Sequence, residues 1–465
     1  MGFVLSILYF ITYYLGPSTV FGSLAAYNVA LIIAALAIAA SLPALPRSFI
    51  LKTPQSLALA GLAVAVFLSV LATGWVGGAF TAFQRFIPGA FAYFLVCLHC
   101  NTRKKLQILV LVLLSVSLFV IIEGNLELTH SASPRGSETL PGDITATVTL
   151  NTPVWNAQHP YLLAQQAVSN EWIYRIRGMD QISDPNDFGQ LLVCVVPLVF
   201  IFWRPKKRVR NTLVVLLPVC GLLYGTFLTH SRGALFSLLA MVIVAGRRRI
   251  GTIPALLLAG ALFIVAFANG FTGGRDISSG SGRMVLWAES IGLLKSHPLF
   301  GVGFGEIADH MDQTSHNSIM VCAAETGMLG LYFWSMFLFS TLRDTLTLAS
   351  PEKVSEGEPN APANGPSEYA TRPKELIEKS EIIRLGQLLT LSFTAFLTAG
   401  FFLSRAFVLT LFLLGGIAEV IYQWALQRGM VSERLKLGRV MLYSAPLSIA
   451  LVVGVYIFIR IGILL

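Results

Sequence analysis

Charged residues are scarce in this chain of 465 residues. Only 12% of its residues are Asp, Glu, Lys or Arg, whereas 55% are hydrophobic, and the mean hydropathy is +0.71. A soluble domain carries about 25% charged residues, so the composition excludes that class. Apolar runs long enough to cross a hydrocarbon core of about 30 Å recur along the chain. The sequence therefore predicts an all-α, polytopic integral membrane protein.

Cysteine is also rare, and several familiar motifs are missing. The chain has five cysteines, nearly all inside apolar runs, and these do not form a disulfide framework. The sequence contains neither an HExxH zinc motif nor a P-loop, and its carboxylates are scattered, so we expect no metal and no cofactor. The opening segment lacks the basic region and cleavage site of a signal peptide, so we expect none.

The formal net charge of +9 lies largely in short clusters between apolar runs. These clusters fall at 103–105, 204–210 and 247–249, which is the positive-inside pattern of cytoplasmic loops. A protein that binds nucleic acid would instead need a basic face on a soluble domain. We therefore expect membrane lipids as the surroundings and no nucleic-acid partner.

Each apolar run that crosses the membrane moves the chain to the opposite side. Counting these crossings divides the chain into seven segments. Membrane helices are expected in 1–122, 188–272, 317–342 and 384–465, twelve or thirteen in all because the first run is short. Segments 123–187 and 273–316 are predicted to be external. Segment 343–383 is rich in Pro, Glu, Asn and Lys, and is predicted to be a disordered cytoplasmic insert.

Arginine and histidine gather on the predicted external side, against the positive-inside bias. A guanidinium group can bind a phosphate through two hydrogen bonds, and a polyprenyl pyrophosphate at the outer leaflet is a natural ligand for it. In the alternative, Arg232 and Arg283 only reach lipid headgroups from helix ends. The external set is Arg175, Arg177, His230, Arg232, Arg275, Arg283, His297, His310, His316 and Arg405.

The external loop 273–316 contains an amphipathic helix in its first half. Met284, Trp287, Ala288 and Ile291 form an apolar stripe at helical spacing. Ser281 can cap this helix near Arg283, and the helix should end before His297-Pro298. We expect it to be an interfacial helix that lies flat on the membrane with Trp287 at the interface.

The second half of the loop combines glycines with a histidine. Gly301, Gly303 and Gly305 predict tight turns, without the strand that a dinucleotide-binding fingerprint requires. His316 stands among Thr314, Ser315 and Asn317, which favours the first turn or cap of the next helix. A histidine at such a place can be purely structural. A neutral imidazole at the positive end of a helix would also suit a general base.

A further helix start is predicted by Asp184-Pro185-Asn186 at the end of segment 123–187. A capped helix entrance and a segment that faces a ligand are both compatible with this pattern, and the sequence does not choose between them.

Four motifs together resemble the superfamily of O-antigen ligases and O-antigen polymerases, which are polytopic membrane glycosyltransferases. They are DPNDFGQLL (184–192), THSRGA (229–234), GRMVLWAESIGLLKSHPLFGVGFG (282–305) and SHNSIMVCAAETGMLG (315–330). The resemblance covers mostly residues 175–340. Segments 123–187 and 343–383 contain long stretches that correspond to nothing in the family.

The resemblance implies a reaction and roles for particular residues. The donor would be an undecaprenyl-pyrophosphate-linked glycan, and the acceptor a hydroxyl on a glycan or glycolipid, either a lipid A core or a growing polysaccharide. Arg232 and Arg283 would hold the pyrophosphate, and His316 would activate the acceptor in a metal-independent, inverting transfer. The candidates of second rank are His230, Arg175, Arg177, Glu325 and Arg405.

The resemblance also implies the bacterial inner membrane, with the active-site loop on the periplasmic or extracellular side. Ligase and polymerase share these motifs, so the sequence does not separate them. A transporter of lipid-linked glycan or polysaccharide without catalytic activity is the alternative. It should show internal repeats and ionisable residues near the midplane, whereas the charges here concentrate at helix ends.

Overall fold

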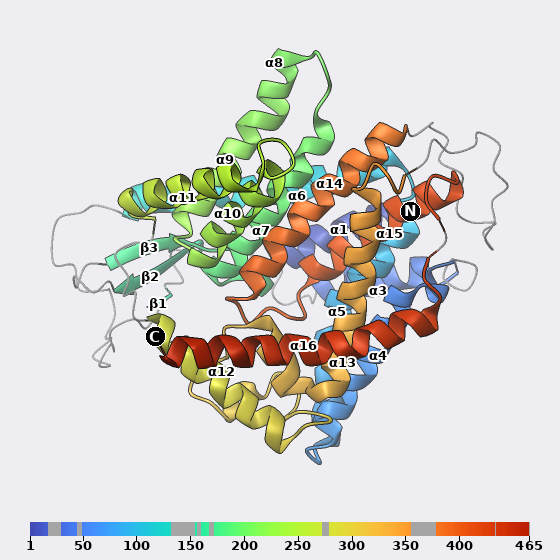
Figure 1. The fold of residues 1–465 in the computed structure, drawn as a ribbon, viewed down its shortest axis with the longest axis vertical. Helices are drawn as coiled ribbons and strands as arrows, with labels where there is room; N and C mark the ends of the chain where they lie inside the picture. Colours follow the sequence, from blue (N-terminus) through green and yellow to red (C-terminus); the bar gives the residue numbers. More distant parts are fainter. Residues whose placement is uncertain are drawn as a thin grey trace. The chain divides into compact units, whose positions relative to one another are not determined.

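The computed structural model describes residues 1–16, 29–43, 49–131, 154–155, 160–166, 172–271, 279–354, 378–432 and 434–464. Helices dominate this part of the chain (Figure 1). They are α1 (Gly2–Leu15), α3 (Val29–Ser41), α4 (Pro54–Leu71), α5 (Val76–His99), α6 (Arg103–Ser131), α7 (Pro185–Val199), α8 (Arg208–Asn211), α9 (Leu217–Leu228), α10 (Arg232–Gly246), α11 (Thr252–Ala268), α12 (Ser279–Ser296), α13 (Ser318–Leu348), α14 (Lys379–Gly400), α15 (Leu409–Gln427) and α16 (Leu437–Leu464).

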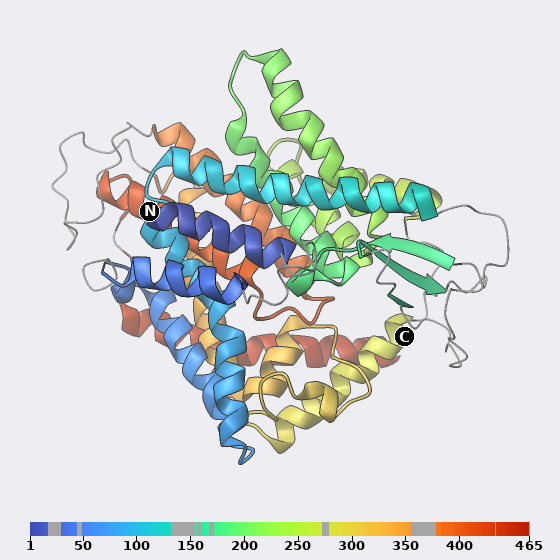
Figure 2. The same ribbon diagram turned by 180° about the vertical axis from the view of Figure 1, so that it is seen from behind.

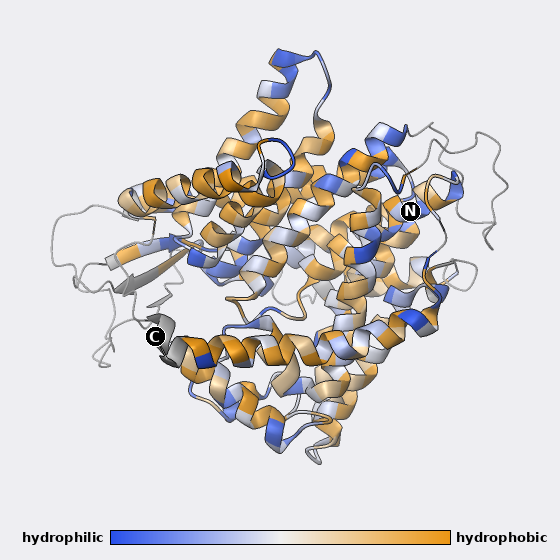
Figure 3. Ribbon diagram, viewed as in Figure 1, coloured by the Kyte–Doolittle hydropathy of each residue, from blue (hydrophilic) through white to orange (hydrophobic). Residues whose placement is uncertain are grey.

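Nine helical stretches within the described residues are long and apolar enough to cross a membrane. They are Pro54–Leu71, Val76–His99, Arg103–Thr129, Pro185–Phe202, Arg208–Leu228, Ser318–Leu348, Lys379–Gly400, Leu409–Gln427 and Leu437–Ile461. Hydrophobic residues run along the helices, and hydrophilic ones gather at their ends and in connections such as the one before α8 (Figure 3). The chain is therefore a multi-pass, all-α membrane protein, as its composition predicts.

Four shorter apolar helices account for the difference from the predicted twelve or thirteen spans. They are Gly2–Leu15, Leu31–Ser41, Arg232–Gly246 and Thr252–Ala268. Three of them coincide with apolar runs that were predicted to span, and Gly2–Leu15 coincides with the short first run that made the predicted number twelve or thirteen. Only their length separates them from the nine.

Several helices extend beyond the predicted segment boundaries. α6 continues to Ser131, past residue 122, and α13 continues to Leu348, past residue 342. α14 likewise begins at Lys379, inside the predicted insert. Hydropathy marks the part of a helix that is suited to lipid, whereas the backbone hydrogen bonds of a helix can continue through polar residues. Most of the predicted insert, and residues 273–278 of the predicted external loop, lie outside the described residues.

A small antiparallel sheet, which the sequence did not predict, lies between α6 and α7 in the chain (Figure 2). Its strands β1 (Val154–Trp155), β2 (Leu162–Gln166) and β3 (Trp172–Ile176) pair in that order. Leu163 pairs with Arg175 across β2 and β3. β3 reads Trp-Ile-Tyr-Arg-Ile, and its aromatic and β-branched residues favour a strand. The sheet carries Arg175, one of the candidate residues.

The chain forms two compact units, and each is described by itself. The first comprises Met1–Phe10, Leu31–Leu109 and Gly280–Leu465, and the second comprises Ile11–Ala30 and Val110–Ser279. In the first unit α13 is the central helix, which packs against α4, α14, α15 and α16. In the second, α7 packs against α9 and α10, and α10 packs against α11.

Aromatic side chains form much of the core of the first unit. The ring of Phe412 lies edge-on to those of Phe86 and Phe337, with centroids 5.9 and 5.5 Å away. Tyr93 extends the cluster, 5.9 Å from Phe337. Such edge-to-face pairs add to the stabilisation that burial provides, and they fix α5, α13 and α15 together.

Candidate functional site

His316 lies directly before α13, where the sequence predicts a helix start. Asn317 is the N-cap, and its Oδ1 accepts hydrogen bonds from the backbone amides of Ile319 and Met320 at 2.9 and 3.1 Å. The predicted helix start is thus confirmed, but His316 lies one residue before the N-cap, whereas the sequence predicted it at the first turn or cap. His316 itself has a φ of +47°, a left-handed conformation that few residues other than glycine adopt. Its backbone turns away from the helix just before the cap.

The connection between α14 and α15, residues 401–408, is fastened to the start of α13 by hydroxyl groups. Ser404 Oγ accepts a hydrogen bond from the backbone N–H of His316 at 2.8 Å and donates one to Thr314 Oγ1 at 2.8 Å. Ser318 Oγ donates to the Leu403 carbonyl at 2.7 Å and accepts from the Arg405 amide at 3.1 Å. These bonds bring Arg405 into the same local structure as His316.

α12 packs against the same end of α13. Its Ser290 Oγ lies 2.5 Å from Ser315 Oγ, next to His316 in the chain. The helix ends at Ser296, before His297-Pro298 as predicted, but it begins at Ser279, well before Arg283. Arg283 is partly exposed on its first half.

The Trp287 side chain is covered by protein, so the prediction that it is exposed at the membrane interface is wrong. The side chain is 2% exposed and packs with Ile291, Met320, Val455 and Ile459. α12 runs beside α16 (Figure 1), and the apolar stripe of α12 meets protein there. A stripe at helical spacing shows which face is buried, but not whether lipid or another helix covers it.

The glycine turn after α12 is inserted into a break in α13. Gly301, Gly303 and Gly305 have φ values of +72°, +113° and +81°, which confirms the predicted tight turns. Gly327 interrupts α13 with a φ of +64°. A side chain at Gly301 would lie 2.4 Å from the Ala324 carbonyl oxygen, so only glycine permits this approach.

Four backbone hydrogen bonds close the break. The amides of Val302 and Gly303 donate to the carbonyls of Ala324 and Glu325 at 2.9 and 3.1 Å. The amides of Met328 and Leu329 donate in turn to the carbonyls of Pro298 and Leu299 at 2.9 and 3.2 Å. In an unbroken helix the 324 and 325 carbonyls would bond to the 328 and 329 amides. The loop therefore supplies the partners of both the carbonyls and the amides that two helical hydrogen bonds would otherwise join.

Glu325 lies at this break and is buried. Its carboxylate accepts a hydrogen bond from the Gly305 backbone amide. Nearby, a hydrogen bond with Asp309 and partial burial raise the pKa of Glu306. The candidate Glu325 is thus built into the contact between the glycine turn and α13.

The second unit contains Arg175, a buried arginine with a structural set of partners. It is 3% exposed, its Nε donates to the Thr229 carbonyl at 2.8 Å, and its Nη2 donates to Asn186 Oδ1 at 2.9 Å. Burial lowers the pKa of Arg175 to about 10, although Asp184 opposes this effect. Arg232 lowers the pKa further, which places these two guanidinium groups within electrostatic reach of each other.

Arg175 joins β3 to two helix starts. Asp184 caps α7 by accepting from the Asn186 amide at 2.7 Å, so the interpretation of this motif as a capped helix entrance is confirmed. That this segment faces a ligand stays a prediction. Arg177 follows β3, and its amide donates to the Tyr161 carbonyl at 2.9 Å. Burial lowers the pKa of the Arg177 guanidinium, and Asp184 opposes that effect.

The turn before α10 presents His230 and Arg232. His230 has a φ of +48°, and its Nδ1 lies 3.0 Å from the Phe271 carbonyl oxygen. Ser231 is the N-cap, and its side chain accepts from the Ala234 amide at 3.3 Å. Arg232 is the first residue of α10.

The structure thus gathers the candidates into two sets, one in each unit. His316, Arg405, Glu325 and Arg283 belong to the first unit, around the start and the break of α13. Arg175, Arg177, His230 and Arg232 belong to the second unit, around β3 and the start of α10. The external arginine Arg275 lies outside the described residues.

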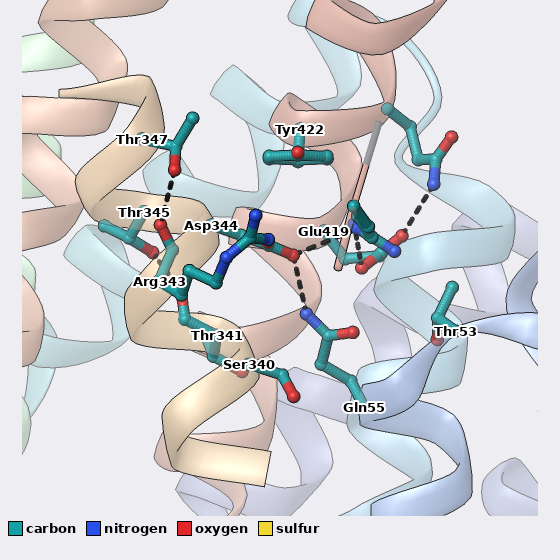
Figure 4. Close-up of polar contacts among 12 residues, drawn as sticks. Thr53, Gln55, Ser340, Thr341, Arg343, Asp344, Thr345, Thr347, Glu419 and Tyr422 are labelled. Carbon is teal, nitrogen blue, oxygen red and sulfur yellow. Dashed lines mark hydrogen bonds and ion pairs between the residues drawn. The ribbon is translucent and has the colours of Figure 1, made fainter. Parts of the chain in front are cut away.

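Sequence reasoning missed a buried ionic cluster toward the other end of α13 (Figure 4). Arg434 Nε lies 3.1 Å from Asp344 Oδ2, and Arg434 Nη2 lies 2.6 Å from Glu419 Oε2. Gln55 Nε2 donates to Asp344 Oδ2 at 2.9 Å, and Gln423 Nε2 donates to Glu419 Oε1 at 3.0 Å. Burial alone would lower the pKa of Arg434, but the two carboxylates raise it overall.

A signal for this cluster was present in the sequence. Asp344 and Glu419 are single acids at the end of or within apolar runs, and an ionisable residue in a membrane helix normally needs a partner. Nothing next to Arg434 in the sequence indicates which acids it meets. The cluster joins α4, α13 and α15 to the segment before α16.

Within the described residues, no three metal-ligating side chains come together. That the reaction needs no metal stays a prediction, because it concerns chemistry. No known family model matches this chain, and no characterised protein matches it.

Proposed function

We propose that this chain is a membrane glycosyltransferase. It would move a glycan from an undecaprenyl-pyrophosphate-linked donor to an acceptor hydroxyl, as an O-antigen ligase or a surface polysaccharide polymerase does. The observation that carries this proposal is the held conformation of His316 at the start of α13, with Arg405 in the connection that holds it. A base whose backbone is held in place, with an arginine in the same connection, suits a reaction whose leaving group is an anion.

In the proposed mechanism His316 takes the proton of the acceptor hydroxyl. The hydroxyl oxygen forms a bond to the anomeric carbon while the bond from that carbon to the pyrophosphate oxygen breaks. Undecaprenyl pyrophosphate leaves with the electron pair, and the configuration inverts. Arg283 and Arg232 bind the pyrophosphate and stabilise its charge through paired N–H groups. The reaction as proposed uses no metal and no cofactor.

The proposal includes a location and two acceptor classes. The protein would lie in the bacterial inner membrane with His316 on the periplasmic or extracellular side. The acceptor would be a lipid A core glycolipid for a ligase and a growing polysaccharide for a polymerase.

The test is a transfer assay with purified protein in detergent and an undecaprenyl-pyrophosphate-linked glycan. Each acceptor class is offered in turn. We expect His316→Ala to lower the transfer rate by about 10²–10⁴-fold, which is the usual contribution of a general base. His310→Ala is the matched control, because His310 is exposed in the same loop, and it should leave the rate unchanged.

Donor binding is measured in the same preparations. Arg283→Ala and Arg232→Ala should weaken it, whereas His316→Ala and the exposed control Arg247→Ala should not. Equal donor affinity in all variants would mean that the arginines serve only lipid headgroups. Transfer by His316→Ala at the normal rate would remove the proposed base. Movement of donor across vesicle membranes without a new glycosidic bond would favour a transporter.

A further inference from the structure

Ser404 stands out among the hydroxyl groups near His316, because both of its hydrogen bonds serve the segment that leads into α13. Its oxygen accepts the backbone N–H of His316, and its proton goes to Thr314 Oγ1, each at 2.8 Å. Ser404 thereby bonds to the residue before Ser315 and to the residue after it. The bond to His316 joins residues 88 apart in the sequence.

The backbone of His316 depends on partners outside its own helix. The Asn317 side chain serves the amides of Ile319 and Met320, which lie after the cap. The amide of His316 lies before the cap and bonds to Ser404 instead. With a φ of +47°, His316 holds a conformation that the surrounding structure must maintain.

The connection that carries Ser404 has other attachments to α13. Ser318 Oγ binds the Leu403 carbonyl and the Arg405 amide. The indole N–H of Trp334, which is 2% exposed, donates to the Ala406 carbonyl at 2.9 Å. Removal of the Ser404 hydroxyl therefore leaves these three hydrogen bonds in place and removes the one to the His316 amide.

We propose that Ser404 is the positioning residue for His316. By fixing the His316 backbone before the cap, it sets where the imidazole stands relative to the acceptor hydroxyl. This inference rests on the proposed function, in which His316 is the base. Small displacements of a catalytic group are costly, because a shift of about 1 Å can lower a rate about 10²-fold.

The experiment compares Ser404→Ala with Ser404→Thr in the detergent transfer assay. Ser404→Ala should lower kcat by about 10-fold or more, with the KM for the lipid-linked donor within about 2-fold of the original. Ser404→Thr keeps a hydroxyl at the same place and should recover most of kcat. The matched control is Ser340→Ala, because Ser340 is buried in α13 and bonds to the Met336 carbonyl, away from His316.

A second measurement does not depend on activity. In ¹⁵N-histidine NMR of the protein in detergent micelles, the His316 signal is identified by its loss in His316→Ala. Ser404→Ala should shift or broaden that signal and leave that of exposed His310 in place. Ser404→Thr and Ser340→Ala should change neither.

The outcomes separate the two proposals. A normal kcat and an unmoved His316 signal in Ser404→Ala overturn the positioning role, even if His316→Ala is inactive. Equal loss in Ser404→Ala and Ser404→Thr, with a lower unfolding temperature in both, overturns it in favour of a general structural role. Full activity in His316→Ala overturns the proposed function, while the NMR comparison still tests whether Ser404 holds His316.

Discussion

Two histidines occupy the same kind of turn, one in each unit. His230 stands in Thr-His-Ser before α10, and His316 stands in Ser-His-Asn before α13. Both have left-handed φ values, +48° and +47°, and each directly precedes an N-cap. The two turns differ in the hydrogen-bond partners of the histidine amides. The His230 amide bonds within its own turn to the Phe227 carbonyl at 3.0 Å, whereas the His316 amide bonds to Ser404.

The ring of His230 has partners of its own. The His230 ring has its Nδ1 3.0 Å from the Phe271 carbonyl and lies 5.7 Å from the Phe227 ring centroid. It therefore ties the α9–α10 turn to the segment that follows α11. Local sequence specifies the turn in both cases, because cap residues and a preceding left-handed residue are local features. Partners from elsewhere in the chain decide what each histidine does.

The largest expected difference between the two turns is catalytic. Asparagine tolerates a left-handed backbone, so His316→Asn and His230→Asn each remove an imidazole without forcing the turn to change. We expect His316→Asn to lower the transfer rate by about 10²–10⁴-fold and His230→Asn by less than about 10-fold. Initial rates in detergent measure both. Equal losses would show that the two histidines are not distinguished by their partners.

A smaller effect is expected on stability when Arg175, which supports the His230 turn, is replaced. Arg175→Ala leaves the Thr229 carbonyl and Asn186 Oδ1 without their charged donor. We expect the free energy of unfolding to fall by about 2–3 kcal/mol, since hydrogen bonds to charged groups contribute about 1.5–3 kcal/mol. Denaturant unfolding of the purified protein measures this. Arg175→Lys should recover part of the loss, because one ammonium group cannot reproduce the planar guanidinium fork.

The control for this prediction is Arg247→Ala, at an exposed position of the same unit. It should change the free energy of unfolding by less than about 0.5 kcal/mol. If Arg175→Ala were as mild as this control, Arg175 would not be the support of the His230 turn.

The smallest expected effect concerns the caps that follow the histidines. Asn317 serves two amides, at 2.9 and 3.1 Å, whereas Ser231 serves one at 3.3 Å. Loss of an N-cap costs about 0.5–2 kcal/mol, so Asn317→Ala should fall near the top of this range and Ser231→Ala near the bottom. Thermal unfolding in detergent compares them. The reverse order would mean that contacts other than the cap set the stability of these helix starts.

The sequence predicted those features whose cause is local. Apolar runs identified the membrane helices, Asn317 and its neighbours identified a helix start, and Pro298 marked the end of α12. Each signal depends on residues within a few positions of one another, which is the range over which caps, turns and helical periodicity act.

The features that were missed depend on partners far apart in the sequence. Ser404 resembles any other serine in a connection until its bond to His316 is seen. The ion pairs of Arg434 were missed, because nothing nearby in the chain shows that it meets Asp344 and Glu419. The prediction for Trp287 was wrong for the same reason, since α16, the helix that covers it, lies far from it in the sequence.

The break in α13 also bears on the order in which the His316 segment is assembled during synthesis. The four hydrogen bonds at Gly327 join residues 298–303 to residues 324–329, and they close a ring of chain that contains His316. This ring can close once residue 329 has been synthesised, because contacts close in sequence need little loop closure. The bond to Ser404 can form only after 75 further residues have been synthesised. A nascent chain that ends before α14 can therefore close the ring of chain that contains His316, but it lacks the hydrogen bond between Ser404 and the His316 amide.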